Sequence, residues 1–291
     1  MMKDTKIYAN GLHFHMIDYG GEGEETIICI HGLTANGRCW DAIAEKLVKH
    51  YRVMAIDLRG RGDSSKPASG YHVNEHVKDI HAIIQQLNLE KVILVGHSLG
   101  AMIGVVFSSM YPETLSSLIL IDGGEDLREE VVDLLHPSIN RVERSYENFY
   151  SYITQVSEIP FFSPWNNYLE QYFYSDVVHY DDGTVISKTK KNIIQEELDN
   201  LMQPIINTCH SSITVPTLIL WAPNCLFHPT AYLISRETGT KLSEMIDDSK
   251  FIEIRGANHF SILFHEFEQT SSEIIHFLKE VQSKKSIATK M

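Results

Sequence analysis

The sequence predicts an α/β fold in which a mostly parallel, doubly wound sheet is covered by helices on both faces. The first observation is a series of short apolar runs rich in β-branched residues, which are typical of buried strands. The second is that helical patterns lie between most of these runs, as in a parallel sheet. The third is that a chain of 291 residues, 43% of them hydrophobic, can bury a large core.

The expected elements follow one another along the chain. The strand sequences are, in order, HFHMIDYG, ETIICIHG, YRVMAIDLRG, KVILVGHS, SSLILIDGG, PTLILWAP and KFIEIRG. Helical periodicity predicts helices over residues 39–50, 73–89, 99–111 (ended by Pro112) and 267–283. Together these elements predict a core made of residues 1–123 and 213–291.

Residues 124–212 interrupt this alternation. The segment is rich in aromatic and acidic residues, so we expect a mainly helical cap inserted after the strand SSLILIDGG. Because an insertion at the carboxyl edge of a parallel sheet lies over the crevice where ligands bind, it should help to form a large hydrophobic pocket. The candidate pocket residues are Phe161, Phe162 and Trp165 from the insertion, and His97 and Phe260 from the core.

Charge and cysteine content argue against several classes of function. The formal net charge is −13, and Lys and Arg form no cluster that would bind nucleic acid or an anionic membrane. The N-terminal residues contain no continuous apolar stretch, so we expect neither a secretion signal nor a membrane anchor, and a cytoplasmic protein. Four cysteines without a CxxC pair suit a reducing compartment.

Residues 92–104, VILVGHSLGAMIG, carry the strongest chemical signal. A GxSxG pattern between a strand and a helix is typical of a strained turn that exposes the serine, here Ser98, as a nucleophile. Only small residues are tolerated two positions away on each side, and Gly96 and Gly100 stand there. The turn should place the Ser98 hydroxyl at a helix N-terminus, where backbone amides favour developing negative charge.

A serine hydroxyl needs a general base, and the chain has 15 histidines. We predict that His259 is this base, because it follows the apolar run KFIEIRG at the carboxyl edge of the sheet. His97 adjoins the serine, but a neighbour on such a turn should point away from it, and His31 should hold its own loop by hydrogen bonds. No metal site is predicted, since ligand spacing does not distinguish the remaining candidates from solvated or half-buried residues: His13, His15, His76 and His81.

Four motifs now give the chain a recognisable pattern: HGLT (31–34), DLRGRGDS (57–64), GHSLG (96–100) and GANHF (256–260). In this order, and across nearly the whole chain, they resemble the α/β-hydrolase superfamily. The resemblance implies a sheet of the α/β-hydrolase type and an oxyanion hole formed by the backbone amides of Leu33 and Leu99. Two preorganised donors of this kind are what a tetrahedral intermediate requires.

The charged residues of DLRGRGDS could also suggest catalysis, but similar residues occur in relatives with different chemistries. We interpret Asp57, Arg59, Arg61 and Asp63 as parts of a loop held by internal ion pairs and glycine turns.

The acid of the expected catalytic triad is missing from its usual place. In most relatives it is the aspartate of a Trp-Gly-x-x-Asp pattern, which corresponds here to Trp221 and the four residues after it. Cys225 stands where the aspartate would be, and a cysteine cannot replace the carboxylate that stabilises an imidazolium.

In zearalenone lactonases and haloalkane dehalogenases the acid lies instead at the end of the preceding strand. Asp122 ends the run SSLILID at the corresponding place, about one strand-helix-strand unit after Ser98. We therefore predict Asp122 as the acid, with two neighbouring carboxylates as alternatives: Glu125 and Asp126.

A Ser-His-Asp triad predicts acyl transfer to water without a cofactor. The leading expectation is a carboxylesterase that acts on an uncharged, apolar small-molecule ester. A lactonase for acyl-homoserine, resorcylic or macrolide lactones would use the same residues, and the displaced acid slightly favours it by analogy. The alternative from another class is a ligand receptor or signalling protein with the same fold, in which hydrolysis is slow.

Overall fold

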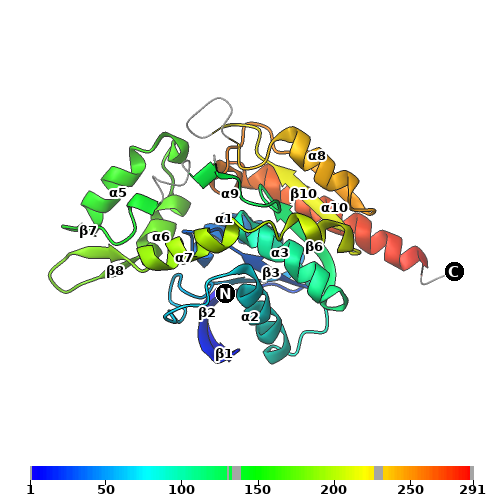
Figure 1. Ribbon diagram of the computed structural model, residues 1–291, viewed down its shortest axis with the longest axis horizontal. Coiled ribbons are helices and arrows are strands. Elements are labelled where there is room, and N and C mark those ends of the chain that lie inside the picture. Colours follow the sequence, from blue (N-terminus) through cyan, green and yellow to red (C-terminus); the bar gives the residue numbers. More distant parts are fainter. Residues whose placement is uncertain (1, 130, 133–138, 226–231, 289–291) are drawn as a thin grey trace.

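An eight-stranded sheet with the order β1-β2-β4-β3-β5-β6-β10-β11 forms the centre of the molecule (Figure 1). This computed structural model describes residues 2–129, 131–132, 139–225 and 232–288. The strands are β1 (Lys3–Ala9), β2 (Leu12–Gly20), β3 (Thr26–Ile30), β4 (Arg52–Ile56), β5 (Val92–His97), β6 (Leu115–Ile121), β10 (Thr217–Trp221) and β11 (Ser249–Glu253). All strands from β4 to β11 in this order pair in parallel, which confirms the predicted fold class.

Strand β1 was not predicted. It pairs antiparallel with β2 at the edge of the sheet, and β2 pairs antiparallel with β4. Its sequence, KDTKIYA, is mostly exposed and contains no apolar run. An edge strand with little buried surface therefore lacks the signal that identified the seven other strands.

Helices cover both faces of the sheet, as predicted. They are α1 (Asp41–Leu47), α2 (Val73–Gln86), α3 (Leu99–Met110), α8 (Arg236–Glu244), α9 (Ser261–Phe264) and α10 (Phe267–Ala288), with short 3₁₀ turns η1 (Gly37–Trp40) and η2 (Pro112–Thr114). Successive residues of β3 point to opposite faces: Ile28 and Ile30 join the core under α2 and α3, whereas Ile27 and Cys29 join the core under α1 and α10.

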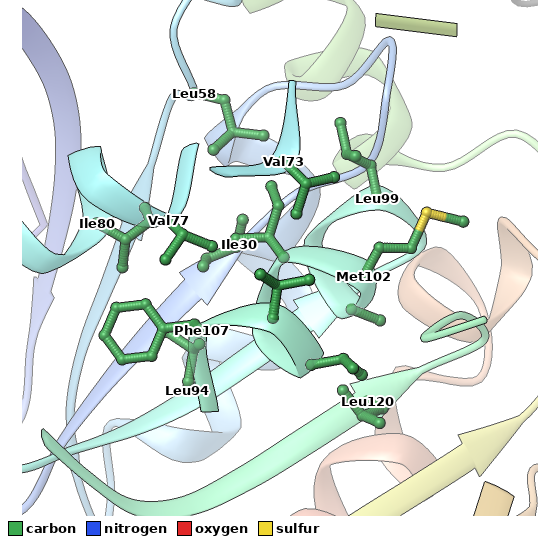
Figure 2. Close-up of a cluster of buried hydrophobic side chains, with 14 of the residues drawn as sticks. Ile30, Leu58, Val73, Val77, Ile80, Leu94, Leu99, Met102, Phe107 and Leu120 are labelled. Atoms are coloured by element: carbon green, nitrogen blue, oxygen red, sulfur yellow. The ribbon is translucent and has the colours of Figure 1, made fainter. Parts of the chain in front are cut away.

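Figure 2 shows the first of these two cores, where side chains from α2 and α3 meet those of the central strands. Val77 of α2 and Phe107 of α3 are fully buried there, as is Ile30 of β3. Each buried side chain of this size contributes about 1.5–3 kcal/mol through the hydrophobic effect. The strand ends above this core are therefore rigid supports for the loops that follow them.

Much of the cap, which we define as residues 124–212, lies on the side of the sheet opposite the C-terminus (Figure 1), and its Tyr168 contacts Phe267 at the start of α10. The cap contains α5 (Phe149–Ser157), α6 (Asn167–Asp176), α7 (Lys191–Leu201) and the 3₁₀ turns η3 (Pro160–Phe162) and η4 (Asn207–Ser212). It also contains a small antiparallel sheet of β7 (Ser145–Tyr146), β9 (Val185–Ser187) and β8 (Val177–His179), which sequence reasoning missed. These strands of two or three residues are too short to show a period of two.

Within the described ranges, none of the helices combines the length and the apolar composition needed to cross a lipid bilayer.

Candidate active site

Ser98 occupies the sharp turn between β5 and α3 that the GxSxG pattern predicts. Its backbone angles are φ 56° and ψ −117°, which few non-glycine residues adopt. A Cβ atom on Gly96 would lie 2.1 Å from the carbonyl oxygen of Gly100, and one on Gly100 would lie 2.1 Å from that of Ile30. Both glycines are therefore required by close backbone approach, and the strain at Ser98 is held by the core around it.

His259 lies between β11 and α9, and its ring contacts Asp122. The distance between His259 Nδ1 and Asp122 Oδ2 is 2.7 Å, and both side chains are buried. A carboxylate at this distance accepts the Nδ1 proton, which leaves Nε2 of a neutral imidazole free to act as a base. The structure thus brings together a histidine and an acid that are 137 residues apart in sequence.

Asp122 is fixed by hydrogen bonds to the end of the neighbouring strand β10. It follows β6 with a left-handed φ of 44°, and its amide donates to the carbonyl of Leu220 at 2.8 Å. Its second carboxylate oxygen, Oδ1, accepts a hydrogen bond of 3.1 Å from the amide of Ala222. The end of β10, where relatives carry the acid, here supplies a donor to the displaced carboxylate.

The chain beyond Ala222 contacts the loop that carries His259. The amide of Asn224 donates to Ala257 at 2.9 Å, and its side chain donates to Gly256 at 2.7 Å. Cys225 follows directly. This segment therefore holds the loop that carries His259.

The two alternative acids, Glu125 and Asp126, make other contacts. Asp126 accepts a hydrogen bond of 2.7 Å from the amide of Ile206. Burial, together with the neighbouring charge of Asp126, raises the pKa of Glu125 to about 7. In the described part of the chain, the only carboxylate hydrogen-bonded to the His259 ring is that of Asp122.

The amides of Leu33 and Leu99 are available to a ligand. Among the described residues neither N–H has a hydrogen-bond acceptor, although both residues are buried. Leu99 is the first residue of α3, so its amide is one of the donors that a helix leaves without an intrahelical partner. Leu33 lines the same pocket as Ser98 and His259.

Ser98 and His259 face this common pocket without a hydrogen bond between their side chains in the described structure. Catalytic hydrogen bonds are often long in the free enzyme and tighten only when substrate is bound. The pocket has a volume of about 40 Å³. Its lining is Gly32, Leu33, Thr34, Ala35, Cys39, His97, Ser98, Tyr172, His259, Phe260, Leu263 and Phe264.

The expectation of a large hydrophobic pocket is therefore wrong, because the cap aromatics pack on one another. Phe260 lines the pocket, but Phe161 stacks behind it at a ring distance of 4.5 Å, and Phe162 lies 5.0 Å from it. Trp165 stacks on Phe173 and is not part of the lining. The sequence contains no signal that separates aromatic residues that fill the cap from those that line the pocket.

Tyr172 and Phe264 line the pocket and were missed by sequence reasoning. Tyr172 belongs to an aromatic run in α6, and its ring lies 5.2 Å from that of Phe264, which comes from α9. The one available signal was the apolar spacing in α6, where Leu169, Tyr172 and Phe173 are all buried. That spacing identifies a buried face but not what it covers.

His97, one of the candidate pocket residues, is among the residues that line the pocket. Its Nε2 donates to the carbonyl oxygen of His259 at 2.8 Å. Burial and the adjacent His259 keep the pKa of His97 well below its usual value, so the ring is neutral near pH 7. It holds the loop that carries the proposed base.

His31 holds its loop by hydrogen bonds, as predicted. Nδ1 donates to the carbonyl of Gly32 at 2.8 Å, and Nε2 accepts from the amide of Leu58 at 3.0 Å. Burial lowers the pKa of His31 to about 4, which keeps the ring in the neutral form that these two bonds require.

The charged residues of DLRGRGDS are structural, but the prediction that their ion pairs are internal to the loop is wrong. Arg59 pairs with Asp79 of α2 at 2.6 Å, and Arg61 pairs with Glu197 of α7 at 2.8 Å. The partners of Asp57 and Asp63 are His15 and Lys188. The loop is too short and too buried for its own charges to face one another, so it pairs with the elements around it.

The histidines considered as metal ligands differ in their surroundings. His13 is exposed and His15 and His81 are half-buried, but His76 is fully buried and lies 2.9 Å from Glu197. His15, Asp57 and Asp63 lie within 4.8 Å of one another, a spacing that could hold a cation. The Asp57 carboxylate already accepts three hydrogen bonds, from the ring of His15 and from the amides of Gly37 and Asp63.

Curated proteins with similar sequences carry several hydrolase names. Epoxide hydrolase 4 from Mus musculus is 28% identical over 247 residues, which cover 77% of this chain and 66% of that protein. 2-(Acetamidomethylene)succinate hydrolase from Mesorhizobium japonicum is 33% identical over 122 residues, which cover 42% of this chain and 44% of that protein. This chain spans less than two thirds of the length of these relatives.

Comparisons with solved structures and with protein families indicate the same fold. The crystal structure of E-2-(acetamidomethylene)succinate hydrolase superimposes with a TM-score of 0.85 at 22% identity, covering 96% of this chain and 100% of that one. Residues 25–266 match the family model described as alpha/beta hydrolase fold. The chain belongs to the α/β-hydrolase fold family.

Proposed function

We propose that this protein is a carboxylesterase, which hydrolyses an uncharged, apolar ester through an acyl-enzyme on Ser98. The observation that carries the proposal is the 2.7 Å contact between His259 Nδ1 and Asp122 Oδ2 beside the strained turn of Ser98. A histidine oriented by a buried carboxylate, in the same pocket as a serine hydroxyl, is the arrangement that activates serine as a nucleophile.

The residues of the pocket can carry each step of such a reaction. Ser98 Oγ attacks the ester carbonyl while His259 Nε2 takes the hydroxyl proton, and Asp122 stabilises the imidazolium that forms. The free amides of Leu33 and Leu99 donate to the oxyanion of the tetrahedral intermediate. His259 then protonates the leaving alcohol and activates a water that hydrolyses the acyl-enzyme.

Serine as the nucleophile favours esters over epoxides. Epoxide hydrolases and dehalogenases of this superfamily attack with an aspartate and form an alkyl ester that water then cleaves. Attack by Ser98 on an epoxide would leave an ether, which the same histidine and water cannot hydrolyse. The similarity to Epoxide hydrolase 4 therefore supports the shared fold more than a shared substrate.

The pocket lining favours a short, uncharged acyl group. The relative from Mesorhizobium japonicum is named for a succinate, which carries carboxylates, but the lining described here contains no Lys or Arg to pair with them. The volume of about 40 Å³ is small and favours a short acyl group. Acetyl to butyryl esters and small lactones suit it better than macrolides do.

A substrate screen tests the proposal. Wild type, Ser98→Ala and Ser108→Ala would be assayed against p-nitrophenyl esters of two to twelve acyl carbons and against lactones of graded ring size. We expect rapid turnover of the short esters by wild type and by the control Ser108→Ala. Ser108 is buried in α3, and its hydroxyl donates to the carbonyl of Val105 in the same helix. Ser98→Ala should be inactive, with a melting temperature within about 3 °C of wild type.

Each other outcome leads to a different conclusion. Activity that persists in Ser98→Ala would contradict the mechanism. A preference for lactones over all linear esters would move the protein to the lactonase class. A single slow turnover that leaves a stable adduct on Ser98 or His259, together with a raised melting temperature, would indicate a receptor.

A further inference from the structure

The loop of residues 32–35, which carries the Leu33 amide, is held by two buried arginines. Arg61 Nε donates to the carbonyl oxygen of Leu33 at 2.9 Å, and Arg141 Nη2 donates to that of Thr34 at 2.6 Å. Arg61 is 0% exposed and Arg141 is 6% exposed. Hydrogen bonds from a charged donor are worth about 1.5–3 kcal/mol each, so these two contacts strongly restrain the loop.

Each arginine is itself anchored to the cap. Arg61 Nη2 lies 2.8 Å from Glu197 Oε2 on α7. Arg141 belongs to the cap and pairs with Asp176 at the end of α6. The hydroxyl of Tyr152 on α5 completes this second group, since it donates to Asp176 at 2.7 Å and accepts from Arg141 at 3.2 Å.

Three consecutive peptide planes of the loop are thereby fixed. His31 holds the carbonyl of Gly32, which shares one planar peptide unit with the amide of Leu33. Arg61 and Arg141 fix the next two planes, so the backbone cannot rotate at Leu33 without breaking a charged hydrogen bond. The direction of the Leu33 N–H therefore depends on the position of both arginines.

We propose that Arg61 and Arg141 are positioning residues for the oxyanion hole, and that docking of the cap orders this hole through Glu197 and Asp176. The proposal rests on the function proposed above. It assigns the cap a part in transition-state stabilisation in addition to enclosing the pocket. Because a misplacement of about 1 Å can lower a rate about 100-fold, loosening either arginine should reduce kcat.

Arg59 provides a matched control within the same motif. It is also buried and also pairs with a carboxylate, that of Asp79, but its other hydrogen bond goes to Gly70 and not to the loop of residues 32–35. Replacing it disturbs a buried ion pair of the same kind without touching the proposed oxyanion hole.

The test compares Arg61→Lys, Arg141→Lys and Arg59→Lys. Lysine keeps the charge but replaces the planar fork by one ammonium, which cannot reach a cap carboxylate and a loop carbonyl with the same geometry. Tyr152→Phe is a milder variant that loosens the Arg141 group if the lysine variants fail to fold. For each protein one would measure kcat and KM on a short ester, and amide hydrogen exchange in residues 31–36.

We expect kcat to fall about 10- to 100-fold in Arg61→Lys and Arg141→Lys, with KM within twofold of wild type. Inhibition by a trifluoromethyl ketone, whose adduct with Ser98 places an oxyanion in the hole, should weaken by the same factor. Hydrogen exchange in residues 31–36 should accelerate in both variants and, to a smaller extent, in Tyr152→Phe. Arg59→Lys should leave all three measurements within twofold of wild type.

Unchanged exchange in residues 31–36, or faster exchange with unchanged kcat, would overturn the proposal. So would an equal loss of kcat in Arg59→Lys, which would indicate a general effect of buried ion pairs. If wild type hydrolyses no ester, the proposed function fails separately. The rate at which a fluorophosphonate labels Ser98 then replaces kcat as the readout for the arginines.

Discussion

Asp122→Asn is the most informative single change, because the two oxygens of this carboxylate face two donors. Oδ2 accepts from His259 Nδ1, and Oδ1 accepts from the amide of Ala222. An asparagine has one acceptor and one NH₂ group, so it cannot satisfy both. If its oxygen keeps the bond to Ala222, its NH₂ group faces the imidazole and requires an unprotonated Nδ1.

The imidazole then carries its proton on Nε2, the nitrogen that should take the proton from Ser98. The same substitution in a serine protease triad lowers kcat about 10⁴-fold by selecting the wrong tautomer. At about 1.36 kcal/mol for each tenfold change, this corresponds to about 5 kcal/mol of transition-state stabilisation. We expect a loss of this size here, with little change in KM.

The assay is steady-state hydrolysis of a short p-nitrophenyl ester by Asp122→Asn, Glu125→Gln and Asp126→Asn, with circular dichroism to check folding. The latter two should retain kcat within about threefold, since their side chains make no hydrogen bond to the His259 ring in the described structure. A folded Asp122→Asn protein with near-normal kcat would refute the assignment of the acid, even if Ser98 proved essential.

Three further changes test other parts of the structure. Gly100→Ala should destabilise the fold by at least about 3 kcal/mol, because the new Cβ would lie 2.1 Å from the backbone oxygen of Ile30. Gly104→Ala, whose Cβ would meet only leucine methyl groups, the nearest at 3.0 Å, should unfold at a much higher urea concentration than Gly100→Ala, and equal midpoints would contradict the packing described for the turn. The depressed pKa of His31, about 4 in the fold against about 6.5 when unfolded, should contribute stability that is complete above pH 6.5 and decreases by about 3 kcal/mol as the pH falls to 4. Urea unfolding of wild type and His31→Gln at pH 7 and pH 4 should show that the variant loses less, and parallel losses would argue against this assignment. Tyr172→Ala removes a large side chain from the pocket lining, so the preferred acyl chain should lengthen by several carbons in the ester screen, whereas an unchanged preference would mean that the acyl group binds elsewhere.

Local signals made the nucleophile turn predictable from sequence. The backbone at Ser98 is determined by residues within a few positions of it, and the glycines that permit the close approach are part of the motif. The contact between Asp122 and His259 needed a longer chain of inference. It depended on the absence of a carboxylate at Cys225 and on the order of strands in a parallel sheet.

The wall of the pocket could not be predicted, because it depends on how the cap packs against the core. Phe161 and Trp165 have the same residue character as Tyr172, yet only Tyr172 reaches the pocket. The partners of Arg61 and Arg59 were missed for the same reason. A charged residue in a loop shows that it needs a counterion, but the counterion can come from any element that the fold brings near.

The position of Asp122 also determines which parts of the molecule are free to vary. The proposed nucleophile, oxyanion donors and acid all precede the cap, at the ends of adjoining strands, and the amide of Ser98 is bonded to the last residue of β6. With Asp122 as the proposed acid, the chain between Trp221 and the His259 loop does not have to supply a carboxylate. Ala222 and Asn224 must still hold Asp122 and the His259 loop, so we expect variation compatible with the proposed chemistry at the other positions of this stretch.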